Sequence, residues 1–257
     1  MYGSSFELDR ELLTGQVAVV TGASRGLGAG LADRFAHWGL AVGLCARTAP
    51  KAPEGADALA MVVDVAEAHE VESFAERVER ELGPISIWVN NAGVLDPVGF
   101  QRDHDPELVS RSLLVNIGGV ANGTRAFTRR ARPVDGRRPT LINVSSGAAT
   151  SVYQGWSIYG ATKAAVDHFT DVVASEEPDI GCHAVSPGVV DTDMQALIRA
   201  QSADDFPTVA RFSQIHAEGR WNSPGWIADH LLAIHTGLIC PPAVKYRVPD
   251  QSGGTSR

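Results

Sequence analysis

A tyrosine and a lysine lie four residues apart in the segment GWSIYGATKAAVDHF, which runs from Gly155 to Phe169. Residues at this spacing share one face of a helix, so Tyr159 and Lys163 are predicted to be neighbours. A free tyrosine has a pKa of about 10, and a nearby ammonium lowers that pKa because it favours the phenolate. A phenol with its pKa moved towards neutral can give a proton to a carbonyl oxygen while a hydride arrives at the carbon.

Two further polar positions could support such chemistry. The segment LINVSSGAAT places Ser145 and Ser146 at the end of a predicted strand, where open α/β sheets bind their ligands. A hydroxyl at Ser146 could donate a hydrogen bond to the oxygen of a reacting carbonyl. Asn116 lies in the predicted helix SLLVNIGGVANG, where it is either part of the site or a structural amide satisfied by the protein.

A glycine-rich turn follows the first predicted strand. In VAVVTGASRGLGAGLADRFA, Gly22, Gly26 and Gly28 stand between that strand and a helix, with Ser24 and Leu27 beside them. Glycines there let the backbone turn tightly and approach a pyrophosphate at the helix N-terminus. Because the turn opens a strand–helix–strand pattern, it predicts a dinucleotide site rather than a ligand-free connection.

The second predicted strand indicates which dinucleotide is bound. It ends in GLCARTAPK and lacks the carboxylate that usually binds the ribose of NAD. Arg47 follows this strand and Arg25 lies in the glycine turn, and guanidinium groups suit a 2′-phosphate. NADP(H) is therefore favoured over NAD(H), the alternative being two solvated surface charges. Asp64 and Val65 end the third strand, where an adenine could lie, although Asp64 could equally cap the next helix.

The elements that must position these residues alternate between strand and helix. Continuous apolar runs of the kind found in strands covered on both faces predict a parallel sheet. These runs cover residues 17–20, 40–44, 59–63, 85–89, 141–144 and 181–185. Residues 71–82 carry apolar side chains at helical spacing. The chain is therefore predicted to be one α/β domain over 1–257, a Rossmann-type doubly wound sheet in three layers.

Composition narrows the class of protein. The chain has 257 residues, 44% of them hydrophobic and 20% charged, which suits a globular domain with a sizeable core. Its net charge of −8 argues against nucleic-acid or anionic-membrane partners. The three cysteines show no metal-ligand spacing, so no metal is predicted, and reduced thiols indicate the cytoplasm. Neither a secretory signal nor a spanning apolar run is visible, so a cytoplasmic location is expected.

Taken together, these motifs resemble the short-chain dehydrogenase/reductase family. TGASRGLG, NNAG, Asn116, Ser146, YGATK and SPGVVDT come in that family's order and spacing, and they cover nearly the whole chain. The resemblance implies Tyr159 as acid and base, with Lys163 lowering its pKa and holding the nicotinamide ribose. It implies that Ser146 polarises the substrate oxygen, and that Asn116 holds a water in a proton relay.

The same resemblance implies further contacts with the cofactor. Asn91, Ala92 and Gly93 are expected beside the adenosine, where they also support the central strand. The segment SPGVVDTDM is expected to line the nicotinamide, with Thr192 near its carboxamide. The cofactor residues expected there are Pro187, Gly188, Val190 and Thr192.

A narrower resemblance, to the sepiapterin reductase and benzil reductase branch, rests on GWSIYGATKAA, ASEEPDI and SPGVVDTDMQALIRAQSADDF. It implies an NADPH-dependent carbonyl reductase of ketones or diketones, an oxidoreductase acting on CH–OH donors. Residues 192–222 are expected to form a lid that excludes water from the reaction. Tyr153 and Trp156, and also Phe206, could wall a flat substrate, or could be ordinary core packing.

The ends of the chain depart from common patterns of the family. Residues 1–14 form an N-terminal extension, and residues 250–257 are expected to be a mobile tail. The segment LICPPAVKYRVPDQSGG lacks a glycine-rich closing motif, which argues against an oxoacyl-carrier-protein reductase. Asp250 is a possible counterpart of the carboxylate that sepiapterin reductases place against a pterin, but its surroundings do not match.

Two other functions remain open, as does the oligomeric state. The chain could oxidise another secondary alcohol, such as a sterol or sugar derivative, or could be a dinucleotide-sensing protein without turnover. The helices around Asn116 and Tyr159 carry apolar residues on more faces than one sheet can bury, so a homodimer or homotetramer is expected. The physiological substrate, its stereochemistry and the direction in the cell are not specified by the sequence.

Overall fold

The computed structural model describes residues 6–251. Seven parallel strands form one sheet in the order β3-β2-β1-β4-β5-β6-β7. The strands are β1 (Val17–Thr21), β2 (Ala41–Ala46), β3 (Ala58–Val62), β4 (Ile85–Asn90), β5 (Thr140–Val144), β6 (Gly181–Ser186) and β7 (Lys245–Arg247). The predicted doubly wound parallel sheet is confirmed, and six of its strands match the predicted runs to within two residues at each end.

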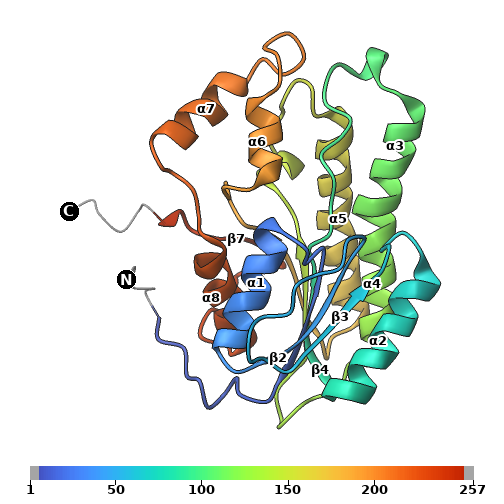
Figure 1. Ribbon diagram of the computed structural model, residues 1–257, viewed down its shortest axis with the longest axis vertical. Helices are drawn as coiled ribbons and strands as arrows, with labels where there is room; N and C mark the ends of the chain where they lie inside the picture. The colour runs from blue at the N-terminus through green and yellow to red at the C-terminus, as the bar shows by residue number, and fades with distance from the viewer. Residues whose placement is uncertain (1–5, 252–257) are drawn as a thin grey trace.

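Helices cover both faces of this sheet (Figure 1). The helices and short helical turns are α1 (Gly26–His37), α2 (Ala68–Leu82), η1 (Gln101–Asp103), α3 (Pro106–Leu113), η2 (Leu114–Gly118), α4 (Gly119–Thr128), η3 (Gly147–Ala149), α5 (Ser157–Glu176), α6 (Asp193–Arg199), α7 (Val209–Ala217) and α8 (Pro224–His235). Successive side chains of a strand point to opposite faces, which builds two cores. Ala18 and Val20 pack with α1 and α8, whereas Val17 and Val19 pack with α2, α4 and α5.

The strand β7 has no counterpart among the predicted elements. It has three residues, exposed or half-buried, and it pairs with the end of β6 from Ala184 to Ser186. A strand this short carries no hydrophobic run of its own, so its pairing depends on neighbouring structure rather than on local sequence.

The extension at the N-terminus and the tail at the C-terminus both contact the domain. Leu8 and Leu13 are buried in the core shared with α8. Gln251 accepts a hydrogen bond from the backbone N–H of Ser223 at 2.7 Å and donates its own N–H to Asn222 at 2.7 Å. Gln251 is thus hydrogen-bonded to the domain. Residues 252–257 lie outside the described part of the chain, and the mobile tail over residues 250–257 stays a prediction.

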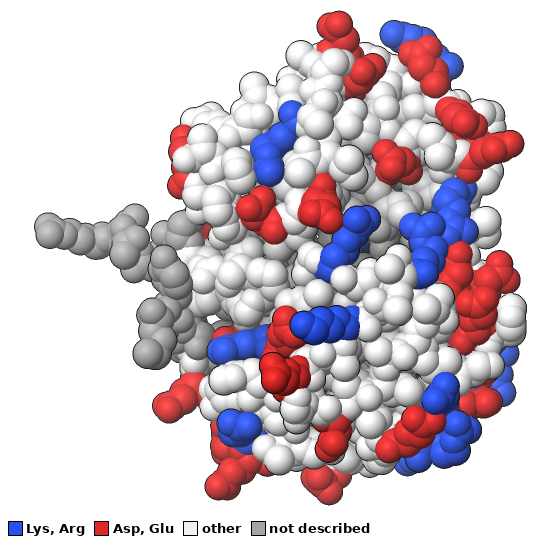
Figure 2. All heavy atoms as spheres, in the orientation of Figure 1, with Lys and Arg blue, Asp and Glu red and all other residues white. Residues whose placement is uncertain are grey.

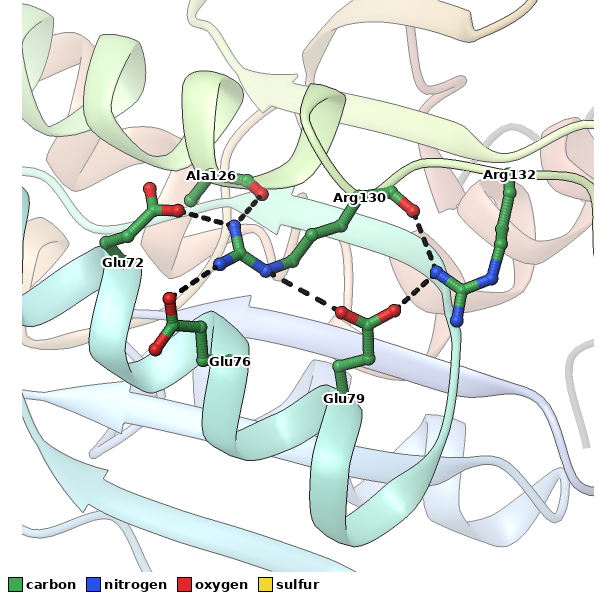
Figure 3. A network of polar contacts seen from close by, with 6 residues as sticks. All are labelled: Glu72, Glu76, Glu79, Ala126, Arg130 and Arg132. Carbon is green, nitrogen blue, oxygen red and sulfur yellow. Dashed lines mark hydrogen bonds and ion pairs between the residues drawn. The ribbon is translucent and has the colours of Figure 1, made fainter.

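A network of ion pairs joins α2 to the end of α4 (Figure 3). The Arg130 guanidinium donates to Glu72 at 2.7 Å, to Glu76 at 3.2 Å and to the carbonyl of Ala126 at 3.0 Å. The Arg130 side chain is only 12% exposed. Arg130 follows shortly after the end of α4, so its ion pairs join α2 and α4 on one face of the sheet.

His235 connects α8 to the sheet through both ring nitrogens. Its Nδ1 lies 2.8 Å from the hydroxyl oxygen of Thr140, and its Nε2 lies 2.7 Å from the side-chain oxygen of Gln16. The ring is 8% exposed. Burial, aided by the positive charge of Arg137, lowers the pKa of His235 to about 4.

We expect the free energy of unfolding to fall as the pH drops from about 6.5 towards 4. In that window the unfolded chain binds a proton at His235 and the folded chain does not, so acid costs about 3 kcal/mol of stability. Urea titrations at a series of pH values should therefore show a flatter pH dependence in His235→Gln than in the unchanged protein. The matched control is His69→Gln, because the His69 side chain is 79% exposed. Equal pH slopes in all three proteins would contradict this assignment.

Candidate active site

Tyr159 and Lys163 lie on one face of α5, as their spacing predicts. Tyr159 is 7% exposed and Lys163 is 5% exposed. The Lys163 ammonium donates a hydrogen bond to the carbonyl of Val144 at 2.8 Å, and its Nζ stands 5.7 Å from the centroid of the Tyr159 ring. The two side chains thus meet at the carboxyl end of β5.

Burial determines the direction of both pKa shifts in this pair. Burial raises the pKa of Tyr159 above its ordinary value, and a hydrogen bond with the Ser146 hydroxyl opposes that rise only in part. Burial also lowers the pKa of Lys163 to about 8, against the attraction of Asp167. Lys163 is not among the groups that shift the pKa of Tyr159 in this arrangement, so the lowering of that pKa by Lys163 stays a prediction. With its pKa raised, Tyr159 is protonated at neutral pH and suited to donating a proton.

The structure separates the two serines that follow β5. Ser146 accepts a hydrogen bond from the N–H of Ala148 at 3.2 Å and also bonds to Tyr159. The Ser145 hydroxyl instead donates to the carboxylate of Asp167 on α5. Of the two, Ser146 therefore has its hydroxyl beside the phenol.

Asn116 is fully buried in a turn of π-helix, η2, between α3 and α4. Its amide nitrogen donates to the carbonyl of Val94 at 2.9 Å and to the hydroxyl of Thr162 at 3.2 Å, and its oxygen accepts from the N–H of Val94 at 2.8 Å. The amide is thus satisfied by the protein, as the structural interpretation expects. A Cβ on Gly93 would lie 3.3 Å from the Asn116 oxygen and 3.7 Å from Lys163 Nζ, so these residues are neighbours. The water relay stays a prediction.

The glycine turn after β1 has the geometry of a backbone cradle. Gly22 and Gly26 adopt left-handed φ angles of 68° and 58°, which favour glycine. A Cβ on Gly28 would lie 2.3 Å from the carbonyl oxygen of Gly22, so the helix and the turn approach each other closely. Arg25 precedes α1 and makes no side-chain cap, which leaves the first N–H groups of the helix available. Ser24 and Leu27 are half-buried in this turn.

The segment after β4 supports the cradle. The Asn91 amide donates to the carbonyls of Thr21 and Gly22 at 2.8 and 3.2 Å, and the N–H of Ala92 donates to the Thr21 hydroxyl at 3.1 Å. The expectation that Asn91 and Ala92 support the central strand is confirmed. Their contact with an adenosine stays a prediction.

Arg25 and Asp64, two charged residues predicted to contact the cofactor, pair with different helices. Arg25 forms an ion pair with Asp193, the first residue of α6, at 3.2 Å. Asp64 accepts a hydrogen bond from Arg111 on α3 at 2.6 Å. Burial acts to raise the pKa of Asp64, but the hydrogen bond from Arg111 and the charges of Arg111 and Arg47 lower it overall. Arg111 was not among the predicted site residues, because its contact with Asp64 becomes visible only in the folded chain.

Two details of the segment after β3 correct the predictions. Asp64 and Val65 do not end that strand, which stops at Val62. Asp64 does not cap α2 either, since Glu67 holds the N-cap position and the Asp64 carboxylate accepts from the N–H of Ala66. Val65 is buried, and its carbonyl accepts from Asn122 on α4 at 2.9 Å, which fixes this segment beside the sheet.

The loop from Pro187 to Thr192 lies between the glycine turn and the C-terminal segment. The buried Asn222 donates to the carbonyl of Pro187 at 2.8 Å. Gly188 has a φ of 76°, and Val190 is buried in the core. A Cβ on Gly26 would lie 3.3 Å from the Thr192 methyl, which places Thr192 directly over the glycine turn. Asp250 pairs with Arg247 at 3.3 Å, and its contact with a substrate stays a prediction.

The predicted lid, residues 192–222, contains α6 and α7, which stand together at the upper left of Figure 1. Its aromatic side chains pack on the start of α5. Phe206 stacks on Trp156 with ring centroids 4.6 Å apart, and Phe212 lies 6.0 Å from Tyr153 and 5.4 Å from Trp156. Tyr159 belongs to the same apolar cluster. Phe212 was not among the predicted site residues. Its position on the apolar side of a helical pattern could have indicated an aromatic side chain that faces inward.

On the face shown in Figure 2, basic and acidic side chains are interspersed and form no continuous basic tract. Within residues 6–251, no cluster of three or more His, Cys, Asp or Glu side chains is placed to hold a metal ion. In the same part of the chain, no helix combines the length and the apolar character needed to cross a membrane.

Comparison with known proteins identifies the family. The model of the family described as short chain dehydrogenase matches residues 16–203. A benzil reductase ((S)-benzoin forming) from Bacillus subtilis strain 168 is 30% identical over 228 residues, which cover 85% of this chain and 93% of that protein. A crystal structure of the KRED1-Pglu enzyme has a TM-score of 0.80 at 32% identity and covers 90% of this chain and 99% of its own.

A third relative was solved with a cofactor. It is a short chain dehydrogenase from Burkholderia cenocepacia J2315 in complex with NADP, with a TM-score of 0.73 at 25% identity over 92% of this chain and 97% of its own. The match to the family model spans well over half of the sequence and includes the glycine turn, Ser146, Tyr159 and Lys163. The chain therefore belongs to the short-chain dehydrogenase family of oxidoreductases.

Proposed function

We propose that this protein is an NADPH-dependent carbonyl reductase that converts a ketone or a vicinal diketone to an alcohol. The observation that carries the proposal is the buried, protonated Tyr159, which is hydrogen-bonded to Ser146 and adjoins Lys163 at the carboxyl ends of the strands. Two relatives support it: a Bacillus subtilis protein bears the name benzil reductase, and a Burkholderia cenocepacia structure contains NADP.

The glycine turn fits a dinucleotide. Its backbone is held so closely at Gly22 and Gly28 that a side chain would displace it, and the N-terminus of α1 offers unpaired N–H groups to a pyrophosphate. Arg25 and Arg47 are both exposed near this turn and would hold a 2′-phosphate. The remaining cofactor contacts would come from Lys163 and from the loop over Gly26, through Pro187, Gly188, Val190 and Thr192.

In the proposed mechanism, bound NADPH supplies a hydride to the carbonyl carbon. The hydroxyls of Ser146 and Tyr159 donate hydrogen bonds to the carbonyl oxygen and orient it. Tyr159 gives its proton to that oxygen as negative charge develops there. The Lys163 ammonium then favours the resulting phenolate, and the lid excludes water. Phe206 and Phe212 belong to the same apolar cluster as Tyr159 and pack on Trp156, so we expect these rings to move when a substrate enters.

A spectrophotometric assay tests the proposal. Mixing the protein with NADPH and benzil should decrease the absorbance of the reduced nicotinamide and form benzoin. Benzil is a suitable probe because it is an aromatic vicinal diketone. Failure to oxidise NADPH with benzil or any other aryl ketone would reject the proposed activity.

We expect Arg47→Ala to weaken NADPH binding by about ten- to a hundredfold and to leave NADH binding nearly unchanged. A charge-assisted hydrogen bond to the 2′-phosphate is lost, and NADH lacks that phosphate. Fluorescence titration of each reduced cofactor measures the two dissociation constants. Arg77→Ala is the control, because Arg77 is paired with Glu81 on the exposed surface of α2. If Arg47→Ala weakened the binding of NADPH and NADH equally, that result would argue against a 2′-phosphate site at Arg47.

We also propose a homodimer or homotetramer. Leu108, Leu113 and Leu114 on α3 and η2 are 46%, 42% and 54% exposed, and Val172 on α5 is 42% exposed. A second copy of the chain would bury these apolar side chains. Sedimentation equilibrium should show an oligomer at micromolar concentration, with dissociation favoured in Leu114→Glu. A monomeric unchanged protein would contradict the proposed oligomer.

A cytoplasmic location remains a prediction.

A further inference from the structure

The indole of Trp156 lies inside the aromatic cluster that covers Tyr159. Trp156 is 5% exposed and occupies the N-cap position of α5, one helical turn before Tyr159. Its ring meets the Tyr159 ring edge-on, with centroids 5.5 Å apart and an interplanar angle of 71°. Phe206 covers one face of the indole at 4.6 Å, with an interplanar angle of 19°.

The indole nitrogen of Trp156 is buried without a hydrogen-bond partner in the described part of the chain. In three other tryptophans of this protein the indole N–H is paired with an acceptor, which is the usual arrangement. Nε1 of Trp38 donates to Asp229 at 2.8 Å, Nε1 of Trp88 to Asn90 at 2.7 Å, and Nε1 of Trp226 to the carbonyl of Pro249 at 2.9 Å. A buried donor left unpaired opposes folding, and native proteins seldom keep one without a role.

The surroundings of this donor indicate the kind of acceptor that it lacks. The cluster around it consists of apolar and aromatic side chains, with Leu95, Ala148 and Ile198 beside the rings. Two phenols reach this cluster: the Tyr159 hydroxyl is engaged with Ser146, and the half-buried Tyr153 ring lies 5.1 Å from the indole, centroid to centroid. Neither pairs with Nε1 of Trp156 in the described part of the chain, so a molecule that enters the cluster can supply the acceptor.

The close approach of the lid also suggests how that molecule binds. A Cβ on Gly155 would lie 2.3 Å from the carbonyl oxygen of Asp205 and 3.3 Å from the Phe206 ring, so the lid rests directly on the residue before Trp156. Phe206 thus presents a flat ring to the indole at stacking distance. An aryl group of a substrate could take the place of the Phe206 ring when the lid moves.

From these observations we infer that Trp156 recognises the substrate, donating its Nε1 hydrogen to the carbonyl oxygen that is not reduced. The phenol of Tyr159 and the indole of Trp156 are hydrogen-bond donors one helical turn apart. Such a pair suits a substrate with oxygens on two adjacent carbons. The preferred substrate class is then an aryl vicinal diketone. This inference rests on the proposed function and adds to it the residue that selects among ketones.

The reaction at such a substrate balances without another reactant. The hydride of NADPH forms a C–H bond at one carbonyl carbon, and the electron pair of that C=O bond moves to its oxygen. That oxygen takes the proton of Tyr159, and the tyrosinate recovers a proton from solvent. The second carbonyl keeps its bond order and accepts the indole hydrogen bond throughout. The products are an α-hydroxy ketone and NADP⁺.

A matched pair of substrates and two variants test the role of Trp156. Benzil and deoxybenzoin carry the same two phenyl groups, but deoxybenzoin lacks the second oxygen. Trp156→Phe removes the N–H and keeps an aromatic ring. Incorporation of benzothienylalanine at position 156 replaces the N–H by sulfur and keeps the bicyclic shape, so it separates the hydrogen bond from packing.

We expect both variants to lower kcat/KM for benzil about three- to tenfold relative to deoxybenzoin, mainly through KM, as the loss of one neutral hydrogen bond implies. Trp38→Phe is the control, because the Trp38 indole donates to Asp229 and packs on the core shared by α1 and α8, away from the cluster around Tyr159. It should leave the ratio of the two substrates unchanged.

A binding measurement provides a second readout. The indole proton resonance of Trp156, assigned by its disappearance in Trp156→Phe, should shift downfield when benzil is added to the protein with NADP⁺, a mixture that cannot react. Deoxybenzoin should cause a smaller shift.

The outcomes separate the two proposals. If the unchanged protein reduces both ketones, but neither variant alters their ratio and the resonance does not move, the role of Trp156 is rejected and the reductase activity stands. If the protein reduces neither ketone with NADPH, the proposed function fails, and the substrate class inferred for Trp156 fails with it.

Discussion

Replacing Tyr159 by phenylalanine is expected to lower kcat for ketone reduction by a factor of about 10² to 10⁴, the range that positioned acid–base groups contribute. The hydroxyl supplies the proton, and its raised pKa keeps that proton in place at neutral pH. The ring of phenylalanine fills the same space in the cluster with Trp156, so the fold and the lid should persist. Steady-state kinetics with NADPH and benzil measure the effect.

The control for this variant separates chemistry from binding. NADPH titration of Tyr159→Phe should give an affinity close to that of the unchanged protein, and Tyr246→Phe on β7 should retain full turnover, because Tyr246 packs against the other core. Unchanged turnover in Tyr159→Phe would show that another group gives the proton.

Replacing Gly28 by alanine is expected to weaken NADPH binding about five- to a hundredfold. The added methyl would lie 2.3 Å from the carbonyl oxygen of Gly22 and 2.6 Å from the Asn91 amide nitrogen, so the backbone of the turn must move. Overpacking of this kind costs roughly 1–3 kcal/mol, and here the displaced atoms form the proposed pyrophosphate cradle. Calorimetric titration with NADPH measures the loss.

Gly225→Ala is the matched control for that variant. Gly225 lies in the first turn of α8, as Gly28 lies in the first turn of α1, and a Cβ there would meet only the Arg34 side chain at 3.9 Å. Alanine is favoured over glycine inside helices, so neither substitution should weaken its helix intrinsically. Equal affinities for NADPH in both variants would argue against a cradle at Gly22 and Gly28.

The parts of the fold that could be predicted are those governed by local pattern. Six strands are recognisable in the sequence as apolar runs, although β3 at the edge of the sheet is partly exposed. The spacing of Tyr159 and Lys163 fixes their shared helix face. The glycine turn is recognisable because its backbone geometry requires glycine at Gly22 and Gly26. In contrast, β7 is too short to carry a pattern and forms only because the end of β6 is there to pair with it.

The parts that could not be predicted depend on contacts between distant segments. Arg111 reaches Asp64 across 47 positions of sequence, and Gln251 reaches Asn222 across 29. The pKa of Tyr159 depends on how deeply the fold buries its hydroxyl, which the spacing to Lys163 does not reveal. The unpaired indole of Trp156 likewise becomes visible only once its surroundings are known.

The central claim is that Tyr159 protonates a carbonyl oxygen while NADPH gives its hydride to the adjoining carbon. The most direct test uses NADPH deuterated at the nicotinamide carbon that carries the transferred hydrogen, with benzil as acceptor and mass spectrometry of the product. We predict benzoin with deuterium on its carbinol carbon from the unchanged protein, and almost none from Tyr159→Phe in the same time. Benzoin without deuterium, or equal labelled product from both proteins, would contradict the claim.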